Sequence, residues 1–125
     1  MTHDSDALLA RFWSAFNSRD PESIAATMTD DVVLEASFGP AVWGTRVVGS
    51  DAVRAFYVDM FAKIPDAHWT ELRRLVGPSH IVVESVLTGT VEGRGAMETA
   101  ICDVLTLRDG KIAAKRSYRK AFAGS

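Results

Sequence analysis

The second half of the chain reads as a succession of β-strands. β-branched and alternating apolar residues fill 67–76, 80–91, 96–108 and 111–120, and Gly-Pro, Gly-Arg-Gly and Asp-Gly sequences separate these segments. Strands that follow one another through short turns pair as an antiparallel meander. We therefore expect an antiparallel sheet built largely from the C-terminal half of the chain.

The first half carries helical patterns instead. Apolar residues recur at helical spacing over 5–18, a stripe made of Leu8, Leu9, Phe12, Trp13 and Phe16. An Asp-Pro pair predicts a short second helix over 21–29, and a third over 50–63 follows a serine cap and stops before a proline. Each of these segments needs a partner surface on which to bury its apolar face.

The order of the patterns indicates the fold class. A strand over 30–37 lies between the second and third helices, and the meander follows all three helices. Helices first and strands afterwards predict an α+β fold with the helices packed on one face of a mainly antiparallel sheet. A length of 125 residues suits a single domain, which we place over 1–125. The lone cysteine, Cys102, excludes an intrachain disulfide.

Composition and charge exclude several functional classes. Hydrophobic residues make up 47% and charged residues 24% of the chain, which is the balance of a globular domain. The net charge of −2 offers no electrostatic footprint for nucleic acid or for an anionic membrane. No apolar run reaches the roughly 20 residues of a membrane helix, and neither a phosphate-binding glycine motif nor metal-ligand spacing occurs. We expect a cytoplasmic protein without a metal or cofactor.

The last hairpin places an acid in an otherwise apolar strand. A three-residue loop, Arg108-Asp109-Gly110, would pair Asp103 directly with Lys115, whereas a two-residue Asp109-Gly110 turn would pair it with Arg116. We favour the three-residue loop, which puts both charges on one face of the sheet. The opposite face then carries Ala100, Val104, Ile112, Ala114 and Tyr118.

Five segments carry a resemblance to a known family, and they occur in family order over nearly the whole chain. They read "FWSAFNSRDPESIAATMTDDVVLEAS", "GSDAVRAFY", "IPDAHW", "LTGTVEG" and "DVLTLRDGKI". With these segments the chain resembles the SnoaL-like and ketosteroid-isomerase-like branch of the nuclear-transport-factor-2-like superfamily. The resemblance implies a cone-shaped, curved sheet wrapped around the N-terminal helices, with a deep apolar pocket inside. Isomerases, cyclases, epoxide hydrolases and non-catalytic proteins share this fold, so the resemblance implies the fold more sharply than the function.

The resemblance also assigns the family's catalytic positions to residues of this chain. Phe12 matches the tyrosine that donates to the enolate in ketosteroid isomerases, and Ala36 matches their general base, with Glu35 beside it. Asp103 matches their protonated oxyanion donor, an acid that an apolar site keeps neutral. Ser117 matches the late aspartate of SnoaL-like cyclases and of limonene-epoxide-hydrolase-like enzymes. Only the Asp103 position keeps the acid of the family.

Three residues are candidates for acid–base chemistry. Asp103 is either a pocket acid or one half of a partly solvated ion pair that braces the hairpin; we predict an ionised pair with Lys115. Glu35 should point away from the pocket by alternation unless a bulge turns it inward, and it is otherwise a rim carboxylate. His68 has the titration range for acid–base work, with a surface position at the start of a strand as the alternative.

Together these patterns predict a small-molecule pocket protein. The leading interpretation is a cofactor-independent isomerase, cyclase or hydratase-like enzyme acting on an apolar steroid-, terpene- or polyketide-like substrate. The alternative is a non-catalytic ligand-binding or dimerisation module of the same fold. We also expect a homodimer through the sheet, because its outer face lacks a cover within the chain. The predicted ligand contacts are Phe12, Phe16, Ala36, Trp43, Phe56, Tyr57, Ile101, Lys115 and Ser117.

Overall fold

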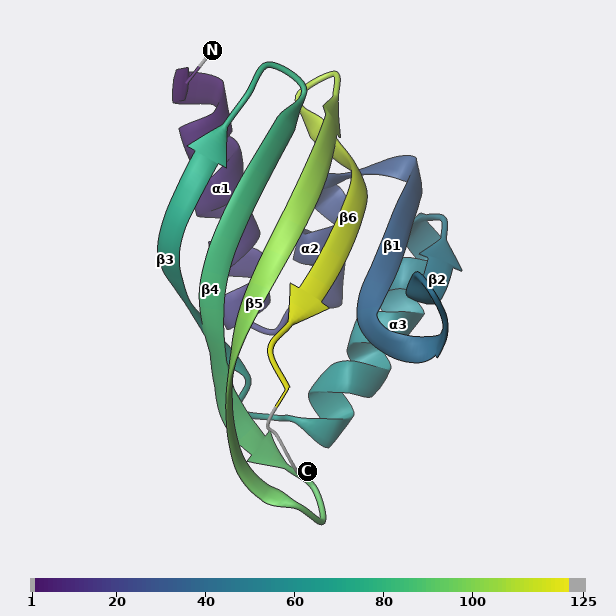
Figure 1. The fold of residues 1–125 in the computed structure, drawn as a ribbon. Helices are drawn as coiled ribbons and strands as arrows, with labels where there is room; N and C mark the ends of the chain where they lie inside the picture. The colour runs from purple at the N-terminus through teal and green to yellow at the C-terminus, as the bar shows by residue number, and fades with distance from the viewer. Residues whose placement is uncertain (1, 122–125) are drawn as a thin grey trace.

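The structure, a computed structural model, describes residues 2–121 of the chain (Figure 1). Three helices and six strands follow one another in this part of the chain. The helices confirm the three predicted segments, with small differences at their ends. In chain order the elements are α1 (Thr2–Asn17), α2 (Pro21–Ala26), β1 (Met28–Ala41), β2 (Gly44–Val48), α3 (Ser50–Lys63), β3 (His68–Val76), β4 (His80–Val91), β5 (Gly95–Arg108) and β6 (Lys111–Arg119).

The strands form one sheet in the order β2-β1-β6-β5-β4-β3. β1 and β6 run parallel, and all the other neighbours are antiparallel. The long strands curve around the helices, which lie together on one face of the sheet (Figure 1). The predicted α+β, cone-shaped, mainly antiparallel fold is thereby confirmed. β2, which pairs with β1 across a Gly-containing turn, was not predicted as a strand.

The core lies between the helices and the inner, concave face of the sheet. Phe16 of α1 is at its centre, because its ring centroid lies 4.5 Å from that of Phe12, 5.1 Å from that of Tyr57 and 5.2 Å from that of Trp69. Each large apolar side chain that is fully buried contributes roughly 1.5–3 kcal/mol to stability. The sheet supplies the facing surface, which includes Val32, Leu34, Ile81, Val83, Leu105 and Ile112.

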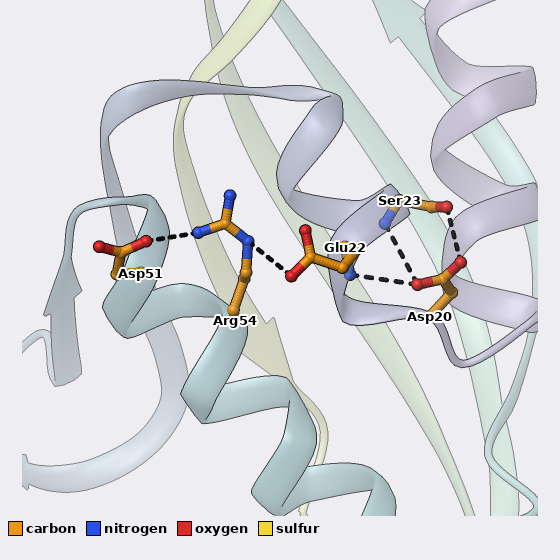
Figure 2. A network of polar contacts seen from close by, with 5 residues as sticks. All are labelled: Asp20, Glu22, Ser23, Asp51 and Arg54. Carbon is orange, nitrogen blue, oxygen red and sulfur yellow. Dashed lines mark hydrogen bonds and ion pairs between the residues drawn. The ribbon is translucent and has the colours of Figure 1, made fainter.

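The start of α2 and the start of α3 are tied together by polar contacts (Figure 2). Asp20 caps α2: its Oδ1 accepts the backbone N–H groups of Glu22 at 3.1 Å and Ser23 at 3.3 Å. The hydroxyl of Ser23 donates to Asp20 Oδ2 at 2.8 Å, and these hydrogen bonds lower the pKa of Asp20. From α3, Arg54 pairs with Glu22 at 3.2 Å and also with Asp51.

α2 ends three residues before its predicted end at residue 29. Thr27 forms the C-cap, and its carbonyl accepts the backbone N–H of Ile112 at 2.9 Å. This bond draws the chain onto β6, so that Met28 already pairs with Ile112 in the sheet. A long-range contact therefore overrides the local helical pattern. The periodicity within 21–29 gives no sign of this contact.

The turn between β5 and β6 differs from the predicted three-residue loop. Asp109 and Gly110 alone form the turn, with φ of +53° and +76°, and Arg108 pairs with Lys111. Two residues in the left-handed region are typical of the type I′ turn, whose twist matches that of the flanking strands. The prediction of a three-residue loop was therefore wrong.

A β-bulge at Ala113 then shifts the register of β6 by one residue. Leu107 is opposite Ile112, but Thr106 is opposite Ala114 and Asp103 is opposite Ser117. Neither predicted partner of Asp103, Lys115 or Arg116, is directly opposed to it. The two-residue turn, which pairs Ile112 with Leu107, places Ile112 in the core, where its exposed fraction is 0%, rather than on the outer face where the sequence pattern had put it.

A comparison of two glycines with the same backbone angle tests how tightly the β1–β2 turn is packed. Gly44 and Gly93 both have φ of +79°, but a Cβ on Gly44 would lie 2.1 Å from the carbonyl oxygen of Ala36, whereas one on Gly93 would meet nothing within 4 Å. We expect Gly93→Ala to lower the free energy of unfolding by about 1–2 kcal/mol through its left-handed angle alone. Gly44→Ala should cost about 1–3 kcal/mol more because of the steric overlap. Equal midpoint shifts of the two variants in urea denaturation would contradict this packing.

Candidate functional site

Polar side chains interrupt the apolar inner face of the sheet on its central strands. Asp103 of β5 is 2% exposed and Lys115 of β6 is 7% exposed, and Ser117 lies two residues beyond Lys115 on the same strand. We call these three residues the inner polar group. Charged side chains at such depth occur only when they are paired, because burial of a lone charge is very costly.

A hydroxyl connects the two charges of the inner polar group. Ser117 donates its Oγ–H to Asp103 Oδ1 at 2.6 Å, and the Lys115 ammonium donates to Ser117 Oγ at 2.9 Å. The Lys115 Nζ also lies 3.4 Å from Asp103 Oδ1. Because Ser117 is directly opposite Asp103 while Lys115 is opposite Leu105, the ammonium reaches the carboxylate diagonally. The predicted contact is made, although through a different register.

The surroundings fix the charge of Lys115. Burial by itself lowers the pKa of the Lys115 ammonium, but the Asp103 carboxylate and the Tyr57 phenol beside it act more strongly in the opposite direction. The net pKa of Lys115 is raised above its ordinary value. Burial also raises the pKa of the Tyr57 phenol. Lys115 is therefore protonated and Tyr57 neutral at physiological pH.

Aromatic side chains from the helices cover the inner polar group. The Lys115 Nζ lies 5.5 Å from the centroid of the Phe16 ring, within the range of a cation–π interaction. Tyr57 of α3 stacks on Phe61 at 5.9 Å and meets Phe16 edge to face. The resulting environment is apolar on the helix side and carries one charge of each sign on the sheet side.

Two hollows on the molecular surface lie elsewhere. One, of about 410 Å³, opens on the outer face of the sheet and is lined by Val86, Glu98, Thr99, Ala100, Lys120 and Ala121. Another, of about 470 Å³, lies at the start of α3 and includes Gly49 and Arg54. Neither is lined by Asp103 or Lys115. The predicted ligand contacts Phe12, Phe16 and Tyr57 instead fill the interior, where each is at most 2% exposed.

Glu35 and His68, the other predicted catalytic residues, lie away from the inner polar group. Glu35 of β1 lies on the outer face, where it pairs with Arg46 at 2.8 Å and with Arg116 at 3.4 Å. This is the orientation that alternation along the strand predicts. His68 is exposed at the start of β3. The structure thus brings Asp103, Lys115 and Ser117 together without Glu35 or His68.

The remaining predicted contacts divide between the interior and the surface. Ala36 shares the inner face of β1 with Leu34 and is buried, and Ile101 shares that of β5 with Asp103 and is half-buried. Phe56 is half-buried beside Tyr57. Trp43 lies in the β1–β2 turn, 45% exposed, with the guanidinium of Arg46 4.3 Å from its ring centroid.

Two polar residues near the site were missed at the level of sequence. Ser85 is fully buried on the inner face of β4, and strict alternation with Val83 and Leu87 in "IVVESVL" would have revealed it. Glu71 is opposite Ser85 on β3 and accepts the indole N–H of Trp13 at 2.8 Å. That contact joins residues 58 positions apart, so no local pattern announces it.

Glu71 is held by its own cation. Arg74 donates to both carboxylate oxygens at 2.8 Å, and this guanidinium lowers the pKa of Glu71. Among the described residues, no three His, Cys, Asp or Glu side chains are grouped so that they could hold a metal ion. None of the described helices is long and apolar enough to cross a membrane.

Comparisons with known proteins agree with this architecture. A family model described as "SnoaL-like domain" matches residues 9–115. A protein with a ketosteroid isomerase-like fold from Catenulispora acidiphila, solved in complex with trimethylamine, is 17% identical with a TM-score of 0.78, covering 89% of this chain and 83% of its own. An LEH-like epoxide hydrolase from M. tuberculosis is 18% identical with a TM-score of 0.75, covering 94% and 84%. An NTF2-like protein from Anabaena variabilis is 14% identical with a TM-score of 0.79, covering 97% and 90%.

At these identities the solved structures share the fold with this chain. No curated protein matches it at a significant level.

Removing one charge of the inner polar group should cost more stability than removing both. Lys115→Met leaves Asp103 buried without its cation, and we expect a loss of about 3–5 kcal/mol in the free energy of unfolding. The double variant Asp103→Asn, Lys115→Met removes both charges with little change in shape, so it should regain most of that loss or exceed the wild type. Urea denaturation measures both. A double variant that is less stable than Lys115→Met would show that the pair is needed for folding.

The raised pKa of Lys115 predicts loss of stability at alkaline pH. The folded protein holds this proton more tightly than the unfolded chain, in which the value is about 10.5. The stabilisation is complete below that pH and is lost as the pH rises toward the folded pKa. Tyr57, raised above 10.0, acts in the same direction. Above about pH 10 the free energy of unfolding should fall by up to about 1.4 kcal/mol per pH unit and group.

The Lys115→Met variant is the control for this pH dependence. Its slope above pH 10 should be smaller by about one proton, because the proton of Lys115 is gone while Tyr57 and the thiol of Cys102, whose pKa burial also raises, are unchanged. Identical slopes for the variant and the wild type, measured by denaturation at a series of pH values, would contradict the assignment to Lys115.

Proposed function

The chain belongs to the SnoaL-like family, and on this premise we propose that it binds a small apolar molecule and transforms it by acid–base chemistry without a cofactor. The reaction is that of an isomerase, a cyclase or a hydratase-like enzyme. Asp103 is the residue that exchanges the proton. The substrate has a mostly apolar skeleton of the steroid, terpene or polyketide kind, in keeping with the aromatic cover of the inner polar group.

The buried ion pair is the observation that carries this proposal. A pair of charges inside a protein rarely adds stability relative to apolar side chains of the same size. Asp103 and Lys115 nevertheless lie 3.4 Å apart in the centre of an apolar core. Ionisable groups held in this way are concentrated at sites where protons are moved, which supports a catalytic role.

The contacts of Asp103 suggest how the group works. Ser117 and Lys115 both contact Oδ1, and no described residue donates a hydrogen bond to Oδ2. Oδ2 is thus the oxygen that takes a proton from a substrate carbon next to a carbonyl group. The electron pair of the broken C–H bond forms a double bond to the carbonyl carbon, and the π pair of the carbonyl group moves onto its oxygen. In a substrate with a neighbouring C=C bond the resulting dienolate takes the proton back from Asp103 at the far carbon of that bond as the carbonyl group re-forms. The Lys115 ammonium and the Tyr57 phenol are placed to stabilise the negative oxygen.

A substrate reaches Asp103 along the half-buried end of the inner face. Going from Asp103 toward the β4–β5 turn, the exposure of β5 rises from Asp103 to Ile101 and Met97. On the side of α3, Phe56 and Met60 are half-buried as well. Methionine side chains adopt many shapes at little cost, so this end can yield to a ligand more readily than the packed centre.

The filled interior favours a second candidate function. Phe12, Phe16 and Tyr57 occupy the space over the sheet, and neither surface hollow reaches Asp103. A non-catalytic ligand-binding or dimerisation module of the same fold needs no open route to the ion pair. In that case Asp103 and Lys115 fix the register of the hairpin and take part in no reaction.

Substituting Asp103 separates these two functions. A thermal-shift screen of steroid-, terpene- and polyketide-like compounds identifies ligands, since a compound at 100 times its Kd stabilises by about 2.7 kcal/mol. Conversion of each hit is then followed by mass spectrometry. We expect Asp103→Asn to bind the hit with similar affinity but to lose about 10²–10⁴-fold in kcat, because the amide cannot take the proton.

The matched control is Glu35→Gln, which makes the same chemical change on the outer face and should convert the hit at the wild-type rate. Unchanged turnover of the Asp103→Asn variant would refute the catalytic role. Binding without any conversion by the wild-type protein would favour the non-catalytic module.

We also propose that the protein is a homodimer formed through the outer face of the sheet. Tyr118 is 59% exposed there, next to half-buried Val104 and the hollow beside Val86 and Ala100. Aromatic residues within an apolar surface patch commonly dominate association. Light scattering at micromolar concentration should give the mass of two chains, and Tyr118→Arg should weaken the dimer at least tenfold. A monomeric wild-type protein would contradict the proposal.

A further inference from the structure

We propose that Ser85 binds an oxygen atom of the ligand and thereby selects neutral carbonyl or hydroxyl compounds over apolar analogues of the same shape. This inference rests on the proposed function, since it concerns the same interior. It adds a residue that none of the comparisons and no catalytic position of the family points to. The argument depends on where Ser85 lies and on what its hydroxyl lacks.

Ser85 occupies the inner face of β4, between two strands that carry carboxylates. It is opposite Ile101 on β5 and opposite Glu71 on β3. Asp103 is opposite Val83, two residues before Ser85, so Ser85 and Asp103 are diagonal neighbours on the same face. Diagonal neighbours in a sheet are about 7–8 Å apart, a spacing that a small group can bridge.

The hydroxyl of Ser85 has no hydrogen-bond partner among the described residues, and the residue is 0% exposed. The two nearby carboxylates do not accept a hydrogen bond from it. Asp103 Oδ1 accepts from Ser117 and forms an ion pair with Lys115, and both oxygens of Glu71 accept from Arg74. A buried hydroxyl without a partner is costly, and the apolar neighbours Val83 and Leu87 show that the position would accept an apolar side chain.

The charges around Ser85 define the ligand that it would hold. Asp103 is balanced by Lys115 and Glu71 by Arg74, so the interior offers no surplus charge to an ionic ligand. A neutral hydroxyl can donate one hydrogen bond to a carbonyl oxygen or exchange hydrogen bonds with an alcohol. The ligand therefore carries an uncharged oxygen at Ser85 and a carbon skeleton that packs under the aromatic side chains of the helices.

A pair of probes with the same skeleton tests this assignment. 2-Tetralone carries one carbonyl group on two fused rings, and tetralin is the same skeleton without the oxygen. We expect the wild-type protein to bind the ketone more tightly. Ser85→Ala should weaken the ketone about threefold to tenfold and leave tetralin unchanged, which is the range of one neutral hydrogen bond. The carbonyl stretch of bound 2-tetralone, measured by infrared difference spectroscopy, should move to higher frequency in the variant.

A second buried hydroxyl provides the control. Thr29 of β1 also has an Oγ1 without a partner, but it lies near the start of β1, next to Met28, which pairs with Ile112 rather than with Lys115 or Ser117. Thr29→Val should bind both probes as the wild type does, with an unchanged carbonyl stretch. Equal losses in the Thr29 and Ser85 variants would overturn the proposal, because they would reflect general loosening of the core.

The outcomes also separate this inference from the proposed function. If the ketone binds and Ser85→Ala changes neither its affinity nor its carbonyl stretch, the role of Ser85 is refuted while a ligand-binding interior stands. If neither probe binds the wild-type protein, the inference about Ser85 is overturned, whereas the proposed function is decided by the screen of steroid-, terpene- and polyketide-like compounds.

Discussion

The β-bulge at Ala113 decides which side chains of β6 face the interior, and the candidate site depends on it. Side chains alternate along a strand, so the register of the two-residue turn alone would continue the inner face from Ile112 through Ala114 and Arg116. The extra residue lets Ile112 face the core and still turns Lys115 and Ser117 inward beside Asp103. Without it an outward-facing lysine and an inward-facing arginine would replace the inner polar group. One extra residue thus gives the hairpin an inner face that carries a carboxylate, an ammonium group and a hydroxyl.

The inner polar group is stabilised by its own members and by Tyr57 and not by solvent. Burial opposes the charge of Lys115, yet the carboxylate and the phenol around it keep the ammonium protonated. Removing any one partner would leave the others buried without a counter-charge or hydrogen bond, and the protein would lose stability because the cost of their desolvation is no longer offset. The same property suits a site that moves protons, because the electrostatic partners are already oriented before a ligand arrives. The rigid strands that hold Asp103 and Ser117 opposite each other supply this orientation.

Periodicity and turn signals in the sequence were sufficient for the three helices, the four C-terminal strands and the α+β class. They were insufficient for the register of the last hairpin, because the turn has two residues instead of the predicted three and a bulge then adds one residue. A bulge has no distinctive composition, and Ala113 looks like its neighbours. Asp103 stood out because an acid within an apolar strand is unusual, and Ser85 could have been found by the same test of alternation. The contact of Trp13 with Glu71 could not have been found in this way, since it depends on how α1 lies against β3.

Glu35 and Asp103 show how position in the sheet determines the chemistry of a carboxylate. Each is an acid within an apolar strand, and each is paired with a cation at 2.8–3.4 Å. Glu35 faces outward to guanidinium groups that are 40–44% exposed, where water screens the interaction and such pairs contribute at most about 1 kcal/mol. Asp103 faces Lys115, whose side chain is 9% exposed, and the low dielectric there strengthens every interaction that the carboxylate makes. The Glu35 pairs lie at the surface of the sheet, whereas the Asp103 pair is enclosed by the helices, and preorganised charges in an enclosed site are what a proton-transfer reaction requires.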